Sequence, residues 1–108
     1  MKLKNNSVKI DNLDERLKSN LENIEGICKC FNGKNYVMTI TSGNDGKHMR
    51  NSLHYENKAI DIRTSDMKNP ELTAKLIQLT FVEELDVVME KDHIHIEYQP
   101  KIQKGGKK

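Results

Sequence analysis

The stretch of this sequence that decides the fold runs from residue 52 to residue 62 and reads Ser52-Leu53-His54-Tyr55-Glu56-Asn57-Lys58-Ala59-Ile60-Asp61-Ile62. Apolar and polar side chains alternate in its second half, as they do in a β-strand with two different faces. We therefore expect a strand over residues 58–63, with Asp61 on one face and the two isoleucines on the other. His54 lies seven residues before Asp61, across a turn that leads into this strand.

The segments on both sides of this strand predict two helices. The first covers residues 12–30, where apolar residues recur at steps of three and four; they are Leu13, Leu17, Leu21, Ile24 and Cys28. Asn12 is expected to cap its start and Asn32-Gly33 to end it. The second helix is expected to begin with Asn69 as its cap and Pro70 at its first position, and to run to about residue 85. Its apolar period is carried by Leu72, Leu76 and Leu79.

Further strands are expected over residues 36–41, 86–89 and 93–98, and the polar segment 42–51 is expected to be a long loop. This order of elements predicts a small single-domain α+β fold with a mostly antiparallel sheet packed by helices. We expect the domain to cover residues 1–100 and a disordered basic tail to cover residues 101–108.

Length and composition exclude several classes of protein. The chain has 108 residues, of which 35% are hydrophobic and 31% charged, which indicates one soluble domain. It has no run of about 18 apolar residues, so no transmembrane helix and no membrane insertion are expected. The lysines at the start are not followed by an apolar stretch, so no signal peptide is expected and synthesis is expected in the cytoplasm. The net charge of +2 does not favour binding to nucleic acid.

The four histidines fall in two short windows, His48 with His54 and His93 with His95. His93 and His95 flank Ile94 and therefore share one face of the last expected strand. Imidazole and carboxylate groups are ligands for Zn²⁺, and three protein ligands plus water are typical of a catalytic zinc site. Spacing alone also fits ordinary surface histidines, so a folded domain without a metal is the simple alternative.

Two motifs carry a resemblance to a known family. The stretch 52–62 resembles the S-x-H-x-x-G-x-A-x-D signature of the zinc D-Ala-D-Ala carboxypeptidases, with Asn57 where that family usually has glycine. That family includes murein endopeptidases and shares its fold with the amino-terminal signalling domain of hedgehog proteins. Residues 52–66 are especially similar to the hedgehog version. The segment Asp92-His93-Ile94-His95 resembles the second family motif, and Ile40-Thr41-Ser42-Gly43 resembles the strand and loop that precede the first.

This resemblance implies a set of site residues. His54, Asp61 and His95 would bind Zn²⁺, and Asp92 would act as the general base that takes a proton from a water activated by zinc. His93 would contact the substrate or the tetrahedral intermediate. Because Asp92 and His95 fall on opposite faces of a straight strand, we expect a bend or bulge at the strand start.

Three more residues are expected to contact the substrate: Ser52 of the first motif, and His48 and Arg50 of the loop before it. Many peptidases of the family continue Ser-Gly with Tyr-Arg, and that arginine is thought to hold a substrate carboxylate. Here Asn44-Asp45 stands in that place, so Arg50 or Lys47 would have to replace the arginine. The alternative is that both are solvated loop charges.

The leading hypothesis is a monomeric zinc metallopeptidase that hydrolyses peptidoglycan stem peptides, either as a D-Ala-D-Ala carboxypeptidase or as a murein endopeptidase. Such an enzyme would act on the cell wall, and its small size suits a phage-encoded enzyme released at lysis or carried in the virion. The alternative is a hedgehog-like, zinc-stabilised binding module without catalysis. Asp92 favours the enzyme, because the hedgehog pattern lacks an acid three residues before its last ligand.

Overall fold

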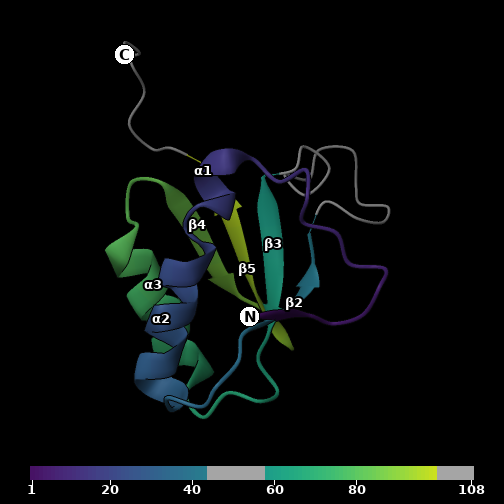
Figure 1. Ribbon diagram of the computed structural model, residues 1–108. Coiled ribbons are helices and arrows are strands. Elements are labelled where there is room, and N and C mark those ends of the chain that lie inside the picture. The colour runs from purple at the N-terminus through teal and green to yellow at the C-terminus, as the bar shows by residue number, and fades with distance from the viewer. Residues whose placement is uncertain (44–57, 100–108) are drawn as a thin grey trace.

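The computed structural model describes residues 1–43 and 58–99, and five strands in these residues form one sheet in the order β1-β2-β3-β5-β4 (Figure 1). The strands are β1 (Lys2–Leu3), β2 (Thr39–Ser42), β3 (Ala59–Arg63), β4 (Leu85–Met89) and β5 (His93–Tyr98). The β2–β3, β3–β5 and β4–β5 pairs are antiparallel, as expected, but β1 lies parallel to β2. The sheet is therefore mixed, and the sequence did not predict β1 because two residues show no alternation.

The first expected helix is present, but it is broken into α1 (Glu15–Lys18) and α2 (Leu21–Asn32). Asp14, and not Asn12, caps α1, since its Oδ1 accepts a hydrogen bond from the Arg16 N–H at 2.9 Å. The side-chain amide of Asn20 donates to the Arg16 carbonyl at 2.9 Å. Polar side chains that bond to the backbone in this way compete with the helix, and α1 ends here. The predicted end of α2 is confirmed at Gly33, whose φ is 103°.

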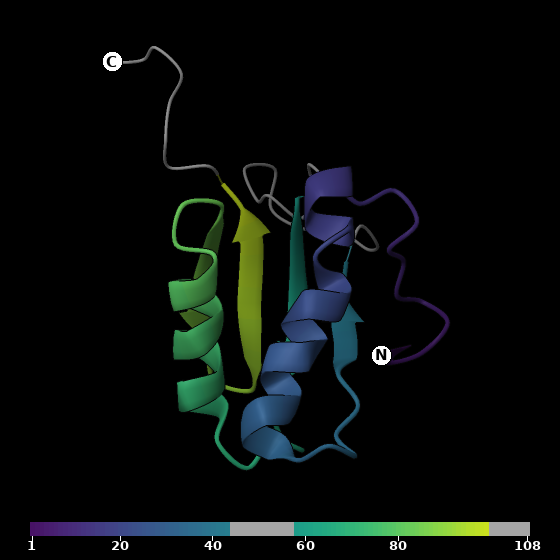
Figure 2. The same ribbon diagram turned by 60° about the vertical axis from the view of Figure 1, so that its left-hand side comes forward.

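The core lies between the helices and one face of the sheet. Figure 2 shows α2 and α3 (Pro70–Thr80) side by side in front of the strands. The predicted apolar stripe of the first helical segment is buried: Leu13, Leu17, Leu21, Ile24 and Cys28. It packs in one cluster with the fully buried isoleucines of the central strands: Ile60, Ile62, Ile94 and Ile96. The alternation expected for β3 and β5 is thus confirmed.

The start of α3 agrees with the sequence, but its buried face does not. Pro70 is its first residue and Asn69 its cap, while the helix ends at Thr80 and not near residue 85. Leu72 and Leu79 are 51% and 64% exposed, and the helix instead buries Thr73, Ala74 and Ile77. The physical reason is a hydrogen bond at 3.0 Å between the Thr73 hydroxyl and Asn32, which turns the small-residue face of α3 toward α2.

The other face of the sheet carries polar groups. Because Ile94 and Ile96 point into the core, His93, His95 and Glu97 point away from it. Asp61 lies on the same face of the neighbouring strand β3. In the described part of the chain, no helix combines the length and the apolar character needed to cross a bilayer.

Candidate functional site

Two of the three predicted metal ligands form a direct pair across neighbouring strands. Asp61 on β3 and His95 on β5 are register partners in the antiparallel ladder. The Asp61 Oδ1 and the His95 Nδ1 lie 2.9 Å apart, and both side chains are mostly shielded from solvent. The sheet register alone brings together two residues that are 34 positions apart in the sequence.

The second ring nitrogen of His95 faces another carboxylate. The Nε2 lies 2.8 Å from Oε1 of Glu97, which stands two residues further along β5 and on the same face. The hydrogen bond to Asp61 raises the pKa of His95 to about 9 against the opposing effect of burial, and Glu97 adds to this rise. At neutral pH the metal-free ring is therefore an imidazolium that donates from both nitrogens.

His93 lies among three carboxylates. Its Nδ1 is 2.8 Å from Oδ1 of Asp92, and its Nε2 is 3.1 Å from Oε1 of Glu90. The same Nε2 is 3.8 Å from the Asp61 Oδ1, which links His93 to the Asp61–His95 pair. The hydrogen bond from His93 lowers the pKa of Asp92, so this carboxyl is ionised at neutral pH.

A cavity of about 420 Å³ opens beside these groups. Its lining brings Asp61, Asp92 and His93 together with two cationic side chains and with hydroxyl groups; the complete lining is Lys4, Thr41, Ser42, Asp61, Arg63, Ser65, Asp92 and His93. Asp92 stands in a bend just before β5, where the alternation of the strand does not fix its direction. The Asp92 carbonyl accepts from the Thr64 N–H at 3.3 Å, and its side chain is 82% exposed.

The remaining predicted site residues lie outside the described residues. They are the third metal ligand His54 and the substrate contacts Ser52, His48 and Arg50. Within residues 1–43 and 58–99, no group of three or more His, Cys, Asp or Glu side chains is arranged to hold a metal ion. The described part of the chain therefore brings the predicted ligands Asp61 and His95 together, and the predicted ligand His54 lies outside it.

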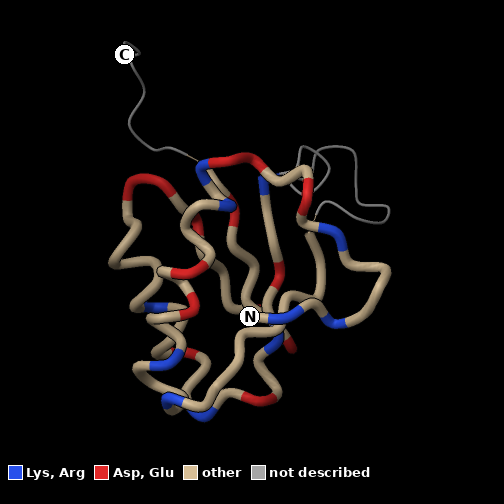
Figure 3. The backbone as a smooth tube through the Cα atoms, viewed as in Figure 1, with Lys and Arg blue, Asp and Glu red and all other residues tan. Residues whose placement is uncertain are grey.

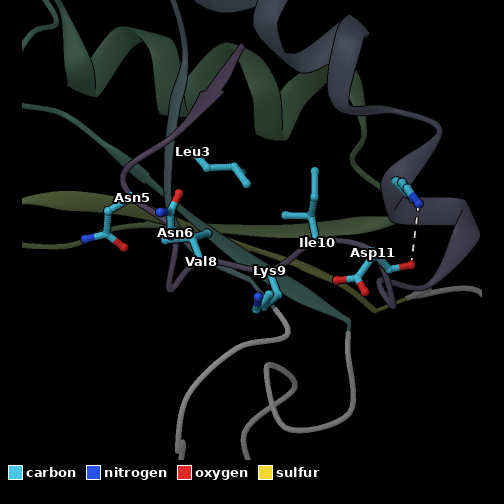
Figure 4. Close-up of a pocket in the computed structure, with 8 residues that line it drawn as sticks. Leu3, Asn5, Asn6, Val8, Lys9, Ile10 and Asp11 are labelled. Atoms are coloured by element: carbon cyan, nitrogen blue, oxygen red, sulfur yellow. Dashed lines mark hydrogen bonds between the residues drawn. The ribbon is translucent and has the colours of Figure 1, made fainter.

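A larger cavity of about 630 Å³ lies away from this chemistry, along the N-terminal segment (Figure 4). Its lining is Leu3, Asn5, Asn6, Val8, Lys9, Ile10, Asp11 and Lys18. The ammonium of Lys18 donates to the carbonyl of Asp11 at 3.5 Å, which is the dashed line in the figure. Since none of the predicted site residues lines this cavity, we assign the candidate site to the smaller one.

In the part of the chain that the structure describes, each helix carries charged residues of both signs. Lysine and arginine positions are interspersed with aspartate and glutamate positions along the described backbone (Figure 3). A binding face for a polyanion would gather cationic side chains into one patch or stripe. The candidate site instead combines carboxylates and imidazoles with Lys4 and Arg63 at its cavity.

Two acidic residues of the site were missed from the sequence. Glu97 could have been found, because residues two apart on a strand share a face and His95 was already a candidate. Glu90 could not have been found from the sequence, because it lies before the bend at residues 91 and 92. The turn between β4 and β5 brings it to His93.

The helix-covered sheet and the histidine–carboxylate face together define a small α+β domain with a candidate metal site between neighbouring strands. The chain belongs to the family of the Hedgehog amino-terminal signalling domain, whose family model matches residues 4–98. This match confirms the hedgehog part of the resemblance and gives no evidence for the carboxypeptidase part. Searches of curated proteins and of solved structures give no match.

Proposed function

We propose that this domain is a hedgehog-like binding module stabilised by Zn²⁺. The observation that carries the proposal is the 2.9 Å approach of the Asp61 Oδ1 to the His95 Nδ1 across β3 and β5. Carboxylate oxygen and imidazole nitrogen are both zinc ligands, so the donor set at this position fits the metal. His54 is the third proposed ligand.

A metal ion bound by Asp61, His95 and His54 would link two adjacent strands and so stabilise the fold. Asp61 and His95 belong to adjacent strands near the middle of the sheet, and His54 precedes β3 in the sequence. A small domain has a thin stability margin, and a ligand that binds only the folded state adds its binding free energy to that margin.

Thermal unfolding of the full chain tests this proposal. We expect the melting temperature to fall by more than 5 °C, roughly the effect of 1 kcal/mol or more in a domain of this size, when a chelator removes zinc. Added zinc should restore it, and added magnesium should not. The melting temperature of His95→Ala should be the same with and without zinc. The control is Glu83→Ala, in the turn after α3, whose melting temperature should respond to zinc as that of the wild type does. Equal melting of the wild type with and without zinc would contradict the proposal.

A second candidate function is hydrolysis of peptidoglycan stem peptides, and the cavity beside Asp61 favours it. Asp92 and His93 line that cavity together with Asp61, so a carboxylate and an imidazole meet where a peptide would bind. Zinc, when bound, would supply Lewis-acid polarisation of the scissile carbonyl. Asp92 would accept a proton from the attacking water and return it to the leaving amine, while His93 would donate a hydrogen bond to the developing oxyanion. Lys4 and Arg63 would attract an anionic group of the peptide.

A digest of purified muropeptides, resolved by mass, distinguishes the two candidates. The peptidase proposal expects product that disappears with chelator and falls about 10²- to 10⁴-fold in Asp92→Asn, the usual effect of losing a general base. Glu83→Gln serves as the control for an equal change of charge away from the cavity. A zinc-loaded protein that releases no product would leave the binding module as the function.

A further inference from the structure

We infer that Glu97 is a positioning residue for the proposed zinc site: its carboxylate accepts the Nε2–H of His95 and so directs Nδ1 of that ring toward Asp61. This inference rests on the proposed function, because it assigns a role toward the same metal. Neither the family model nor the sequence motifs assign Glu97 a role.

The first step of the argument is the orientation of the His95 ring. Its Nδ1 lies 2.9 Å from Asp61 and its Nε2 lies 2.8 Å from Glu97, so the two nitrogens face two different carboxylates. A metal ion can bind only a nitrogen without a proton, and a neutral imidazole keeps one proton on the other nitrogen. If the ligand nitrogen faces Asp61, the retained proton faces Glu97.

The second step is that Glu97 is itself held in place. It lies on the same face of β5 as His95, and its backbone is paired on both sides, with Ala59 of β3 and Asp86 of β4. With its amide nitrogen turned toward the carboxylates, Gln99 donates to Oε2 of Glu97 at 2.6 Å and to Oδ2 of Asp86 at 3.2 Å. One oxygen of Glu97 is thus fixed by Gln99, and the other is directed at His95.

The third step is the chemistry of such a contact. A carboxylate that accepts the second N–H of a metal-binding histidine fixes the tautomer and the ring direction and makes the ligand nitrogen more basic. Residues in this position contribute about 10- to 100-fold to metal affinity. Glu90 and Asp92 instead contact His93, at 3.1 and 2.8 Å.

Zinc affinity, measured by competition with a chromophoric chelator on the full chain, tests the inference. We expect Glu97→Ala to weaken zinc binding by about 10- to 100-fold. Glu97→Gln should recover most of the affinity, because its amide oxygen still accepts the Nε2–H. The matched control is Glu83→Ala, which removes the same charge from the turn after α3 and should bind zinc like the wild type.

A second readout reports the tautomer directly. In zinc-loaded protein with ¹⁵N-labelled histidine, the Nε2 of His95 should carry its proton and exchange slowly in the wild type and in Glu97→Gln. In Glu97→Ala that proton should exchange rapidly.

The outcomes separate this inference from the proposed function. Zinc affinity in Glu97→Ala equal to that of the wild type would overturn the role of Glu97 and leave the zinc site standing. An equal loss of affinity in Glu97→Gln and Glu97→Ala would also overturn it, since Glu97 would then act through its charge or as a direct ligand. A wild-type protein that binds no zinc would overturn the proposed function and this inference together.

Discussion

Thr39 carries a buried hydroxyl that has no hydrogen-bond partner among the described residues. A buried polar group without a partner costs about 1–3 kcal/mol, so replacing the hydroxyl by a methyl group of the same shape removes that cost. We predict that Thr39→Val raises the free energy of unfolding by about 1 kcal/mol, measured by urea denaturation.

Thr73 is the matched control for this substitution. It is equally buried, but its hydroxyl donates to the Asn69 carbonyl at 2.7 Å and accepts from Asn32 at 3.0 Å. Thr73→Val should therefore destabilise the protein by about 1–3 kcal/mol, because it leaves a buried partner unsatisfied. A loss of stability in both variants would contradict the assignment of Thr39 as unpaired.

Glu25 links stability to pH. Burial opposes the ionisation of its carboxyl, but hydrogen bonds from the Met1 ammonium at 2.7 Å and the Met38 N–H at 3.0 Å outweigh it and lower the pKa. A lowered folded-state pKa stabilises the protein above the unfolded value of about 4.3, and this contribution is lost as the pH falls through the folded-state pKa.

We therefore predict that Glu25→Gln lowers the free energy of unfolding by about 1 kcal/mol at pH 7, because the charge-assisted hydrogen bonds are lost. The difference from the wild type should shrink as the pH falls below about 4. Urea denaturation at several pH values measures it, and a difference that stays constant down to pH 3 would be the contrary result.

At the scale of elements, one buried asparagine joins the end of α2 to the start of α3. The Asn32 amide nitrogen donates to the Cys28 carbonyl at 2.8 Å and to the Thr73 hydroxyl at 3.0 Å. Its oxygen accepts from the N–H groups of Lys68 and Asn69 at 2.7 and 2.9 Å. The side chain thus links the last turn of α2 to two backbone N–H groups and a hydroxyl at the start of α3.

We predict that Asn32→Ala lowers the free energy of unfolding by about 2–4 kcal/mol, since several buried partners lose their hydrogen bonds at once. Asn23→Ala is the control, because Asn23 is exposed on α2 and should change stability by less than about 0.5 kcal/mol. Chemical denaturation measures both. A small effect at Asn32 would mean that water replaces its contacts.

The hydrogen bond between Asn32 and Thr73 shows why some features of the helices and strands could not be predicted from the sequence. Only the family resemblance implied that Asp61 and His95 lie together, whereas strand alternation predicted the faces of β3 and β5. It did not predict which face of α3 is buried, because that choice depends on Asn32 of another helix reaching Thr73. The break between α1 and α2 also escaped prediction, since it lies where the side-chain amide of Asn20 bonds to the Arg16 carbonyl.

At the scale of the whole molecule, the fold divides the sheet into a structural face and a chemical face. The helices and isoleucines occupy one face, and the other carries Asp61, His93, His95 and Glu97. The resemblance of residues 52–66 to hedgehog proteins indicated the hedgehog-like class, and Asp61 of this segment lies on the chemical face. The parallel pairing of β1 with β2 could not be predicted, because it depends on how the N-terminal segment lies along the edge of the folded sheet.

The most direct test of the central claim is the zinc content of the purified chain after equilibrium dialysis, measured by atomic emission. We predict one zinc ion per chain in the wild type and in His93→Ala, which keeps both members of the Asp61–His95 pair. Asp61→Ala and His95→Ala should each lose the metal while remaining folded by circular dichroism. A wild-type protein without zinc, or folded Asp61→Ala and His95→Ala variants that keep it, would contradict the account.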